Sequence, residues 1–330
     1  MIEISGLSKK YGSSYAIKDL NLKIEDGLIY GFLGPNGAGK STTMNIITGY
    51  LSATSGTVTV DGHDILKEPE EAKSCIGYLP ETPPLYPEMT VMEYMSFVAE
   101  LKKVDKKDRS KQISDIMDMV ELKVVKDKLI RSLSKGYRQR VGMAQAMISF
   151  PDIIILDEPT VGLDPKQIIE IRDLIRSLKG KHTVILSSHI LSEVSAVCDK
   201  ILILSKGSLV AQGTPEELEM MMQSEGELEL TVKGDGEIVS DILSDMDEVI
   251  SFESTGASIK GKEPCDRGVG SENEPELISF SIKVKEGEEI RDRLSIRLAE
   301  RNIPVYSLIK NEKTLEDIFL ELTDTQEVSL

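Results

Sequence analysis

The first 60 residues are organised into short apolar runs separated by turns. Residues 2–7, 15–24, 28–33 and 57–60 are rich in alternating or β-branched apolar positions, a pattern typical of strands. The third run ends at a glycine-rich segment, and residues 41–48 after it have the composition of a helix. The pattern therefore predicts a strand, a glycine loop and a helix in direct succession.

The middle of the chain changes from helical to strand periodicity. Between Glu88 and Val125 apolar residues recur every three or four positions, which predicts a helical insertion over about residues 86–145. Asp152–Asp157 and Thr183–Ser188 are short runs rich in Ile, Val and Leu, and a helix, Pro165–Leu178, is predicted between them. Short continuous apolar runs are typical of strands buried on both faces of a parallel sheet, where helices form the crossovers.

The composition changes after Gly213, where a predicted helix, Pro215–Met222, leads into a second group of elements. We expect the order strand, helix, strand, strand, helix, strand, which is the split-βαβ arrangement of a small α+β domain. The six elements are residues 227–232, 237–246, 249–259, 277–284, 287–301 and 304–309. Residues 261–276 are predicted to form an exposed loop, and Thr314–Leu322 to form a closing amphipathic helix.

Net charge divides the chain at about the same place. The 330 residues include 39 Lys and Arg against 56 Asp and Glu, a formal charge of −17, and residues 221–330 contribute 12 basic and 26 acidic side chains to it. We predict two domains, residues 1–215 and an acidic accessory or regulatory domain, residues 216–330. An acidic chain is poorly suited to duplex nucleic acid, because that binding depends on Lys and Arg at the phosphates. We therefore expect no nucleic-acid partner, although a local phosphate site needs no such excess.

Cysteine and apolar content predict a cytoplasmic protein. Cys75, Cys198 and Cys265 lie far apart without CxxC spacing, which indicates neither a zinc site nor a disulfide framework. The chain opens directly on a strand-like run, so we expect no signal peptide. Its longest apolar clusters, such as Ile153–Leu156 and Ile201–Leu204, are far shorter than the roughly 20 residues that cross a bilayer.

The segment after the third predicted strand fits the phosphate-loop pattern GxxxxGK[ST]. Its residues are Gly34, Pro35, Asn36, Gly37, Ala38, Gly39, Lys40 and Ser41, and Thr42 follows. Glycines let successive backbone N–H groups surround phosphate oxygens, and the helix that follows adds its positive end. In this pattern the lysine reaches the β- and γ-phosphates, and the serine hydroxyl ligates Mg²⁺. The predicted ligands are thus a nucleoside triphosphate and Mg²⁺; the alternative is a chance match.

Two acidic residues, Asp157 and Glu158, directly follow the apolar run Ile153–Leu156. In α/β proteins, ligands bind at the carboxyl ends of the strands. We expect Asp157 to hold Mg²⁺ through water, and Glu158 to orient and deprotonate the attacking water. The alternative is a buried strand that merely ends in an acidic turn, and a phosphate loop in the same chain argues against it.

Further segments resemble the motifs of the ATP-binding cassette (ABC) family. Leu133–Arg140 (LSKGYRQR) resembles its signature motif, and Asp157–Thr160, Gly162–Pro165 and Ser187–His189 follow in the family's order. The resemblance covers about residues 1–215. It implies a P-loop α/β cassette with a mixed sheet core, an antiparallel β subdomain and the helical insertion. It also implies the activity of a Mg-dependent ATPase.

In this family two cassettes pair head to tail over two ATP molecules, so the resemblance implies that a second subunit completes each site. Ser134 and Gly136 would contact the γ-phosphate in trans, and Asp164 would face the partner across the dimer. His189 would bind the γ-phosphate and the attacking water. Tyr11 occupies the place where the family stacks an aromatic ring on adenine, and a surface tyrosine is the alternative.

The sequence departs from the family pattern at two positions. Glu81 stands where the family usually has a glutamine that contacts Mg²⁺; its carboxylate still offers oxygen to the metal but adds negative charge beside a triphosphate. Lys135 replaces a glycine in the signature motif and brings a positive charge near the opposite ATP. The proline-rich loop, residues 82–87, lies where the family receives a helix of the membrane subunit.

The resemblance implies the ATPase subunit of an ABC transporter of the exporter-type group with a C-terminal accessory domain. Its cofactors would be ATP and Mg²⁺, and its partners a second cassette and a separate membrane permease. It would lie on the inner face of the cell membrane through that permease. The alternatives are a soluble cassette ATPase of translation or DNA maintenance, and a regulatory nucleotide-binding module without useful turnover. Nothing in the sequence names a cargo.

Overall fold

The computed structural model describes residues 1–222, 226–254, 277–285 and 289–311. These residues group into two compact units that divide after Leu218. The predicted loop over residues 261–276 and the predicted helix Thr314–Leu322 lie outside the described residues, as does Cys265. None of the helices in the described ranges is long and apolar enough to cross a membrane.

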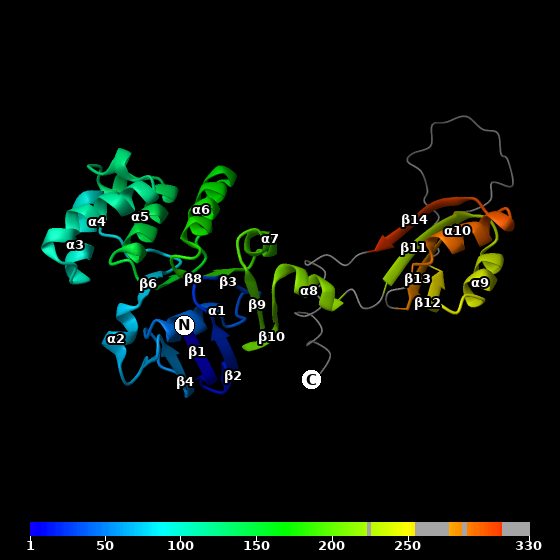
Figure 1. Ribbon diagram of the computed structural model, residues 1–330, viewed down its shortest axis with the longest axis horizontal. Helices are drawn as coiled ribbons and strands as arrows, with labels where there is room; N and C mark the ends of the chain where they lie inside the picture. The colour runs from blue at the N-terminus through cyan, green and yellow to red at the C-terminus, as the bar shows by residue number, and fades with distance from the viewer. Residues whose placement is uncertain (223–225, 255–276, 286–288, 312–330) are drawn as a thin grey trace. The chain divides into compact units, whose positions relative to one another are not determined.

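A six-stranded sheet in the order β10-β9-β3-β8-β7-β6 forms the centre of the first unit (Figure 1). Its parallel strands are β3 (Ile29–Leu33), β6 (Ile76–Leu79), β7 (Ile153–Leu156), β8 (Thr183–Ser188) and β9 (Lys200–Ser205), and β10 (Ser208–Gly213) is antiparallel to β9. Every residue of β3, β7 and β8 is buried, which confirms the prediction of central strands covered on both faces. Because these strands are parallel, the segments that follow them meet at one edge of the sheet.

A second, antiparallel sheet has the order β2-β1-β4-β5. It consists of β1 (Ile2–Tyr11), β2 (Ser14–Ile24), β4 (Ser55–Val60) and β5 (His63–Asp64). Its buried residues, such as Ile2 and Leu7, share one apolar cluster with Met44 and Ile47 of α1 (Lys40–Ile47) and with Phe32 of the central sheet. Helix α1, which follows the glycine loop, is therefore clamped between the two sheets.

The predicted helical insertion consists of three helices that pack together (Figure 1). They are α3 (Val91–Leu101), α4 (Lys106–Met119) and α5 (Lys135–Met147), with short 3₁₀ turns at residues 123–125 and 130–132. A capping box between Thr90 and Glu93 fixes the start of α3. The unit also contains α2 (Pro69–Ser74), α6 (Pro165–Leu178) and α7 (Leu191–Ser195). Helix α8 (Pro215–Met222) spans the division after Leu218.

Lys102 connects the end of α3 to the end of α5. Its ammonium group donates hydrogen bonds to the carbonyl oxygens of Ala146, at 3.3 Å, and Ile148, at 2.9 Å. Burial lowers the pKa of Lys102 from its ordinary value of 10.5 to about 8. Between about pH 8 and about pH 10 the unfolded chain therefore retains a proton that the folded protein has released, so the free energy of unfolding rises with pH in this window.

We expect Lys102→Met to remove that rise. Denaturant unfolding at about pH 7.5 and about pH 9.5 measures it, because the wild type should gain more stability between these two values than the variant does. Lys103→Met, at a neighbouring exposed position, is the matched control and should keep the wild-type pH dependence. Equal pH dependence in Lys102→Met and wild type would show that Lys102 does not release its proton in the folded state.

The second unit is a four-stranded antiparallel sheet in the order β12-β13-β11-β14 with two helices. Its elements are β11 (Gly226–Lys233), α9 (Gly236–Ser244), β12 (Val249–Ser254), β13 (Leu277–Val284), α10 (Arg291–Glu300) and β14 (Val305–Asn311). Alternate strand residues such as Leu230 and Ile282 form one apolar cluster with Leu243 of α9 and Leu294 of α10. Because β13 pairs between β11 and β12, the arrangement is the predicted split-βαβ fold.

Candidate active site

A cavity of about 410 Å³ opens where the segments after β3, β7 and β8 meet. Most of its lining comes from the predicted phosphate loop and the first turn of α1. The lining residues are Ala16, Asn36, Gly37, Ala38, Gly39, Lys40, Ser41, Thr42, Glu81, Glu158, Val161 and His189. The structure thus gathers most residues of the predicted nucleotide site around one cavity.

The phosphate loop needs its glycines for backbone conformation and for space. Gly37 and Gly39 have φ values of 83° and 106°, in the left-handed region that other residues rarely adopt. A Cβ on Gly39 would lie 2.7 Å from the carbonyl oxygen of Ala16, and one on Gly34 would lie 2.4 Å from that of Leu204. Larger side chains would therefore displace the loop from the strands that hold it.

Lys40, the first residue of α1, is held inside the loop. Its ammonium group donates hydrogen bonds to the carbonyl oxygens of Gly34, at 2.7 Å, and Pro35, at 3.3 Å. It also lies 3.9 Å from a carboxylate oxygen of Glu158. Burial lowers the pKa of Lys40, while the nearby charges of Glu158 and Asp157 oppose that shift. The loop therefore has a cation at the base of the cavity, where a phosphate would bind.

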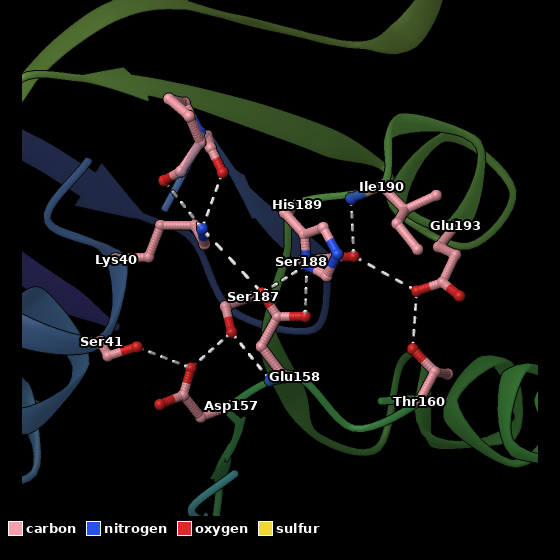
Figure 2. Close-up of polar contacts among 12 residues, drawn as sticks. Lys40, Ser41, Asp157, Glu158, Thr160, Ser187, Ser188, His189, Ile190 and Glu193 are labelled. Carbon is pink, nitrogen blue, oxygen red and sulfur yellow. Dashed lines mark hydrogen bonds and ion pairs between the residues drawn. The ribbon is translucent and has the colours of Figure 1, made fainter. Parts of the chain in front are cut away.

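The two carboxylates after β7 are tied to Ser187 at the end of β8 (Figure 2). Ser187 donates a hydrogen bond of 2.6 Å to Asp157, and its oxygen accepts one of 2.8 Å from the backbone N–H of Glu158. Ser41 also donates to Asp157, at 3.3 Å. The role of Ser187 is not predictable from the sequence, because only the pairing of β7 with β8 places its hydroxyl between the two acidic residues.

Glu158 has a strained backbone and a buried carboxylate. Its φ is 48°, a conformation that is unfavourable for a residue other than glycine and that concentrates at functional sites. Both carboxylate oxygens contact Nδ1 of His189, at 3.2 and 3.1 Å. Glu158 and His189 therefore form a hydrogen-bonded pair, and both line the cavity.

The oxygen groups at this edge suit a hard divalent cation. The Ser41 hydroxyl contacts Asp157, and the two residues line a neighbouring cavity of about 760 Å³ together with Glu81. Hydroxyl and carboxylate oxygens are the ligands that Mg²⁺ prefers. Ser41, Asp157 and Glu81 are thus compatible with the predicted metal.

Seven predicted residues do not line the nucleotide cavity. Gly34, Pro35 and Asp157 contact residues that do line it. The other four are Tyr11, Ser134, Gly136 and Asp164. Ser134 caps the start of α5 through a hydrogen bond from the N–H of Tyr137, and Asp164 caps α6 through one of 2.9 Å from the N–H of Gln167. Gly136 packs so closely on α6 that a Cβ would lie 2.7 Å from the side chain of Gln167.

Tyr11 ends β1 and is 53% exposed, with the ammonium of Lys9 at 5.3 Å from its ring centroid. An exposed ring of this kind is free to stack on a base. Its role therefore stays a prediction, as do those of Ser134, Gly136 and Asp164.

Three buried polar residues lie beside the Glu158–His189 pair: Thr160, Ser188 and Glu193 (Figure 2). Thr160 and Ser188 belong to the matched motifs without a predicted role, and no sequence pattern indicates Glu193. Thr160 donates a hydrogen bond of 2.6 Å to Glu193, and Ser188 donates one of 3.2 Å to the same carboxylate. Burial of hydrogen-bonded polar side chains is the signal of such a network, and it is visible only in the structure.

The sequence also did not predict a group of three side chains that could ligate a metal ion. The ligand atoms of Asp61, Cys75 and Asp152 lie within 4.8 Å of one another. Burial raises the pKa of the Cys75 thiol, and the charges of Asp61 and Asp152 raise it further. Metal binding needs the thiolate, so we assign no metal to this group.

The fold and the cavity define a P-loop ATPase with a helical insertion and an antiparallel β subdomain. Residues 17–161 match the family model described as ABC transporter. The linearmycin resistance ATP-binding protein LnrL of Bacillus subtilis is 31% identical over 325 residues, which cover 98% of both chains. The bacitracin transport ATP-binding protein BcrA of Bacillus licheniformis is 31% identical over 98% of this chain and 97% of its own.

Two solved structures share the fold of the first unit. An ATP-binding subunit of an ABC transporter has a TM-score of 0.62 at 29% identity, and covers 67% of this chain and 92% of its own. A dimeric ATP-binding cassette, MJ0796, in a post-hydrolysis state with ADP and Pi has a TM-score of 0.59 at 29% identity, and covers 65% of this chain and 98% of its own. The chain belongs to the ABC transporter family and is an ATP-binding subunit with ATPase activity.

Proposed function

We propose that this subunit drives export by a separate membrane permease, at the inner face of the cell membrane. The observation that carries the proposal is the full-length similarity to LnrL and BcrA, which includes the acidic second unit. These relatives are named for linearmycin resistance and bacitracin transport. Similarity along the whole chain therefore favours a transporter over a soluble cassette ATPase or a regulatory module.

Purification from membranes tests this assignment. The tagged chain, expressed in its native host, should be recovered in the membrane fraction together with a membrane-spanning protein. In cells that lack that protein, the chain should appear in the soluble fraction. Recovery only in soluble fractions, with no membrane protein attached, would contradict the permease partner.

We infer that the phosphate loop and the pair of carboxylates divide the chemistry of hydrolysis. Backbone N–H groups of the loop bind the phosphates, and Lys40 exchanges the carbonyls of Gly34 and Pro35 for phosphate oxygens. Ser41, Asp157 and Glu81 would hold Mg²⁺, which neutralises phosphate charge when bound. Glu158 takes a proton from the attacking water, and His189, whose Nδ1 contacts the Glu158 carboxylate, would bind the γ-phosphate and the same water.

The reaction also needs a second cassette. A relative of similar fold forms a dimer, and Ser134 lies exposed at the start of α5, outside its own chain's cavity. A helix N-terminus that presents a hydroxyl and free N–H groups binds anions. We propose that Ser134 and the backbone at Gly136 contact the γ-phosphate bound by the partner, and that Asp164 lies at the same interface.

Ser134→Glu should abolish the ATP-dependent dimer, because it places a carboxylate against the γ-phosphate of the partner's nucleotide. Dimer formation is measured by light scattering with Mg-ATP in the Glu158→Gln background, where slow hydrolysis preserves the complex. Nucleotide binding by the monomer should stay within about twofold of wild type, because Ser134 does not line the cavity of its own chain. Ser132→Glu, two residues away and exposed, is the matched control and should still dimerise.

We propose that the second unit supports dimerisation or regulates turnover, by analogy with other split-βαβ domains. Its high negative charge is unsuited to an anionic ligand or membrane surface. Removal of residues 219–330 with no change in dimerisation, turnover or permease coupling would leave the unit without such a role.

A further inference from the structure

We infer that Glu193, on α7, is a positioning residue that holds the turn carrying His189 against the segment carrying Glu158. The inference rests on the proposed catalytic roles of Glu158 and His189. Glu193 is not one of the described residues that line the nucleotide cavity. Its carboxylate has no part in the proposed chemistry.

Glu193 joins two segments that are remote in sequence. One carboxylate oxygen, Oε2, accepts hydrogen bonds from Thr160, two residues after Glu158, and from Ser188, directly before His189. Ser188 also accepts a hydrogen bond of 3.0 Å from the backbone N–H of Ile190. The turn that carries His189 is thus fixed on both sides, as Figure 2 shows.

Burial makes this network stiff. Thr160, Ser188 and Glu193 are 7%, 1% and 8% exposed, so water does not readily replace the lost partner when one of them is removed. Among the described residues, the side-chain partners of the Glu193 carboxylate are the hydroxyl groups of Thr160 and Ser188. Its role is therefore that of a hydrogen-bond acceptor between two segments and not of a charge partner.

His189 depends on such a support. Its side chain is 44% exposed, and the only side-chain hydrogen bonds recorded for its ring among the described residues are those to Glu158. The ring therefore keeps its distance from Glu158 only if the backbone at residue 189 is held from elsewhere. Displacement of a reacting group by about 1 Å costs up to about 100-fold in rate.

Because both hydrogen bonds go to a single oxygen of Glu193, two substitutions can separate loss of the acceptor from loss of the charge. In Glu193→Gln the amide oxygen can occupy the place of Oε2 and accept hydrogen bonds from both hydroxyl groups. Glu193→Leu has similar volume and accepts neither. We expect Glu193→Leu to lower kcat by about 10-fold to 100-fold with ATP affinity within about twofold, and Glu193→Gln to retain wild-type kcat within about threefold.

A double-mutant cycle separates positioning of His189 from a general structural effect. In a single-turnover assay with labelled ATP, Glu193→Leu should slow the wild type but add less than about twofold in the His189→Ala background, because the group that it positions is then absent. Equal slowing in both backgrounds, or no slowing of the wild type, would overturn the inference. Normal turnover by His189→Ala would instead contradict the proposed role of His189.

Two further variants guard against misfolding. If Glu193→Leu is not soluble, Thr160→Val removes one hydrogen bond to Glu193, and Ser188→Ala removes the other together with the one from the N–H of Ile190. Both variants change the shape little, and each should slow turnover with the same dependence on His189. Ser192→Leu alters the exposed side of the same helix and should leave kcat unchanged. Full activity in both Thr160→Val and Ser188→Ala would contradict the proposal as clearly as full activity in Glu193→Leu.

Discussion

Glu158→Gln is expected to bind ATP as the wild type does and to hydrolyse it about 10²–10⁴-fold more slowly, the usual contribution of general acid–base catalysis. The substitution keeps the shape of the side chain and one hydrogen-bond acceptor for His189, but an amide cannot take a proton from water. The buried position and the contacts with Lys40 and His189 should survive. The loss should therefore appear in kcat and not in nucleotide affinity.

Phosphate release and titration with a fluorescent ATP analogue measure the two quantities separately. The same variant should accumulate as an ATP-bound dimer, because closure no longer ends in hydrolysis. Glu71→Gln, an identical change at an exposed site on α2, should behave as wild type in both assays. Normal turnover by Glu158→Gln would assign the proton transfer to another group.

Lys40→Ala should weaken ATP binding by at least about 30-fold, since removal of one partner from a buried, hydrogen-bonded charge pair costs about 2–5 kcal/mol. The ammonium lies at the base of the cavity, and no other lysine or arginine lines it among the described residues. Its loss also leaves the carbonyls of Gly34 and Pro35 without their donor. Affinity and turnover at fixed ATP should therefore fall together.

Isothermal titration with ATP and Mg²⁺ measures this loss directly. Lys111→Ala, at an exposed position of α4, removes an equal charge far from the loop and should bind ATP normally. Thermal unfolding with and without nucleotide gives a second readout, because a ligand stabilises only the form that binds it. If Lys40→Ala bound ATP with wild-type affinity, the prediction that the phosphate loop binds the nucleotide would be wrong.

The sequence predicted those parts of the fold that local patterns determine. The buried strands β7 and β8, the helix Pro165–Leu178 and the order of elements in the second unit follow from apolar periodicity and appear as expected. Element ends were less accurate. Helix α10 begins at Arg291, whereas the prediction began at residue 287, because the apolar pattern marks a helix face but not the point where its first turn closes.

The candidate site divides in the same way. Lys40, Ser41, Asp157 and Glu158 are specified by short motifs, and the structure brings them together with contacts that the motifs imply. The contacts of Ser187 and Glu193 carry no local signal, because the motif that contains Ser187 does not state what its hydroxyl touches and an isolated glutamate is ordinary in any helix. Their significance arises from burial and from partners about 30 residues away in the chain, which only the tertiary fold supplies.

The left-handed backbone of Glu158 has a consequence for how such a chain diverges. Glycine or asparagine would occupy that φ of 48° with less strain than glutamate does. In a descendant that no longer needs to hydrolyse nucleotide, replacing this residue by glycine or asparagine would relieve the backbone strain and raise folding stability. Such a replacement would also remove the proposed catalytic base. A glutamate at this position is therefore what the proposed catalytic role predicts, because backbone conformation alone would favour another residue.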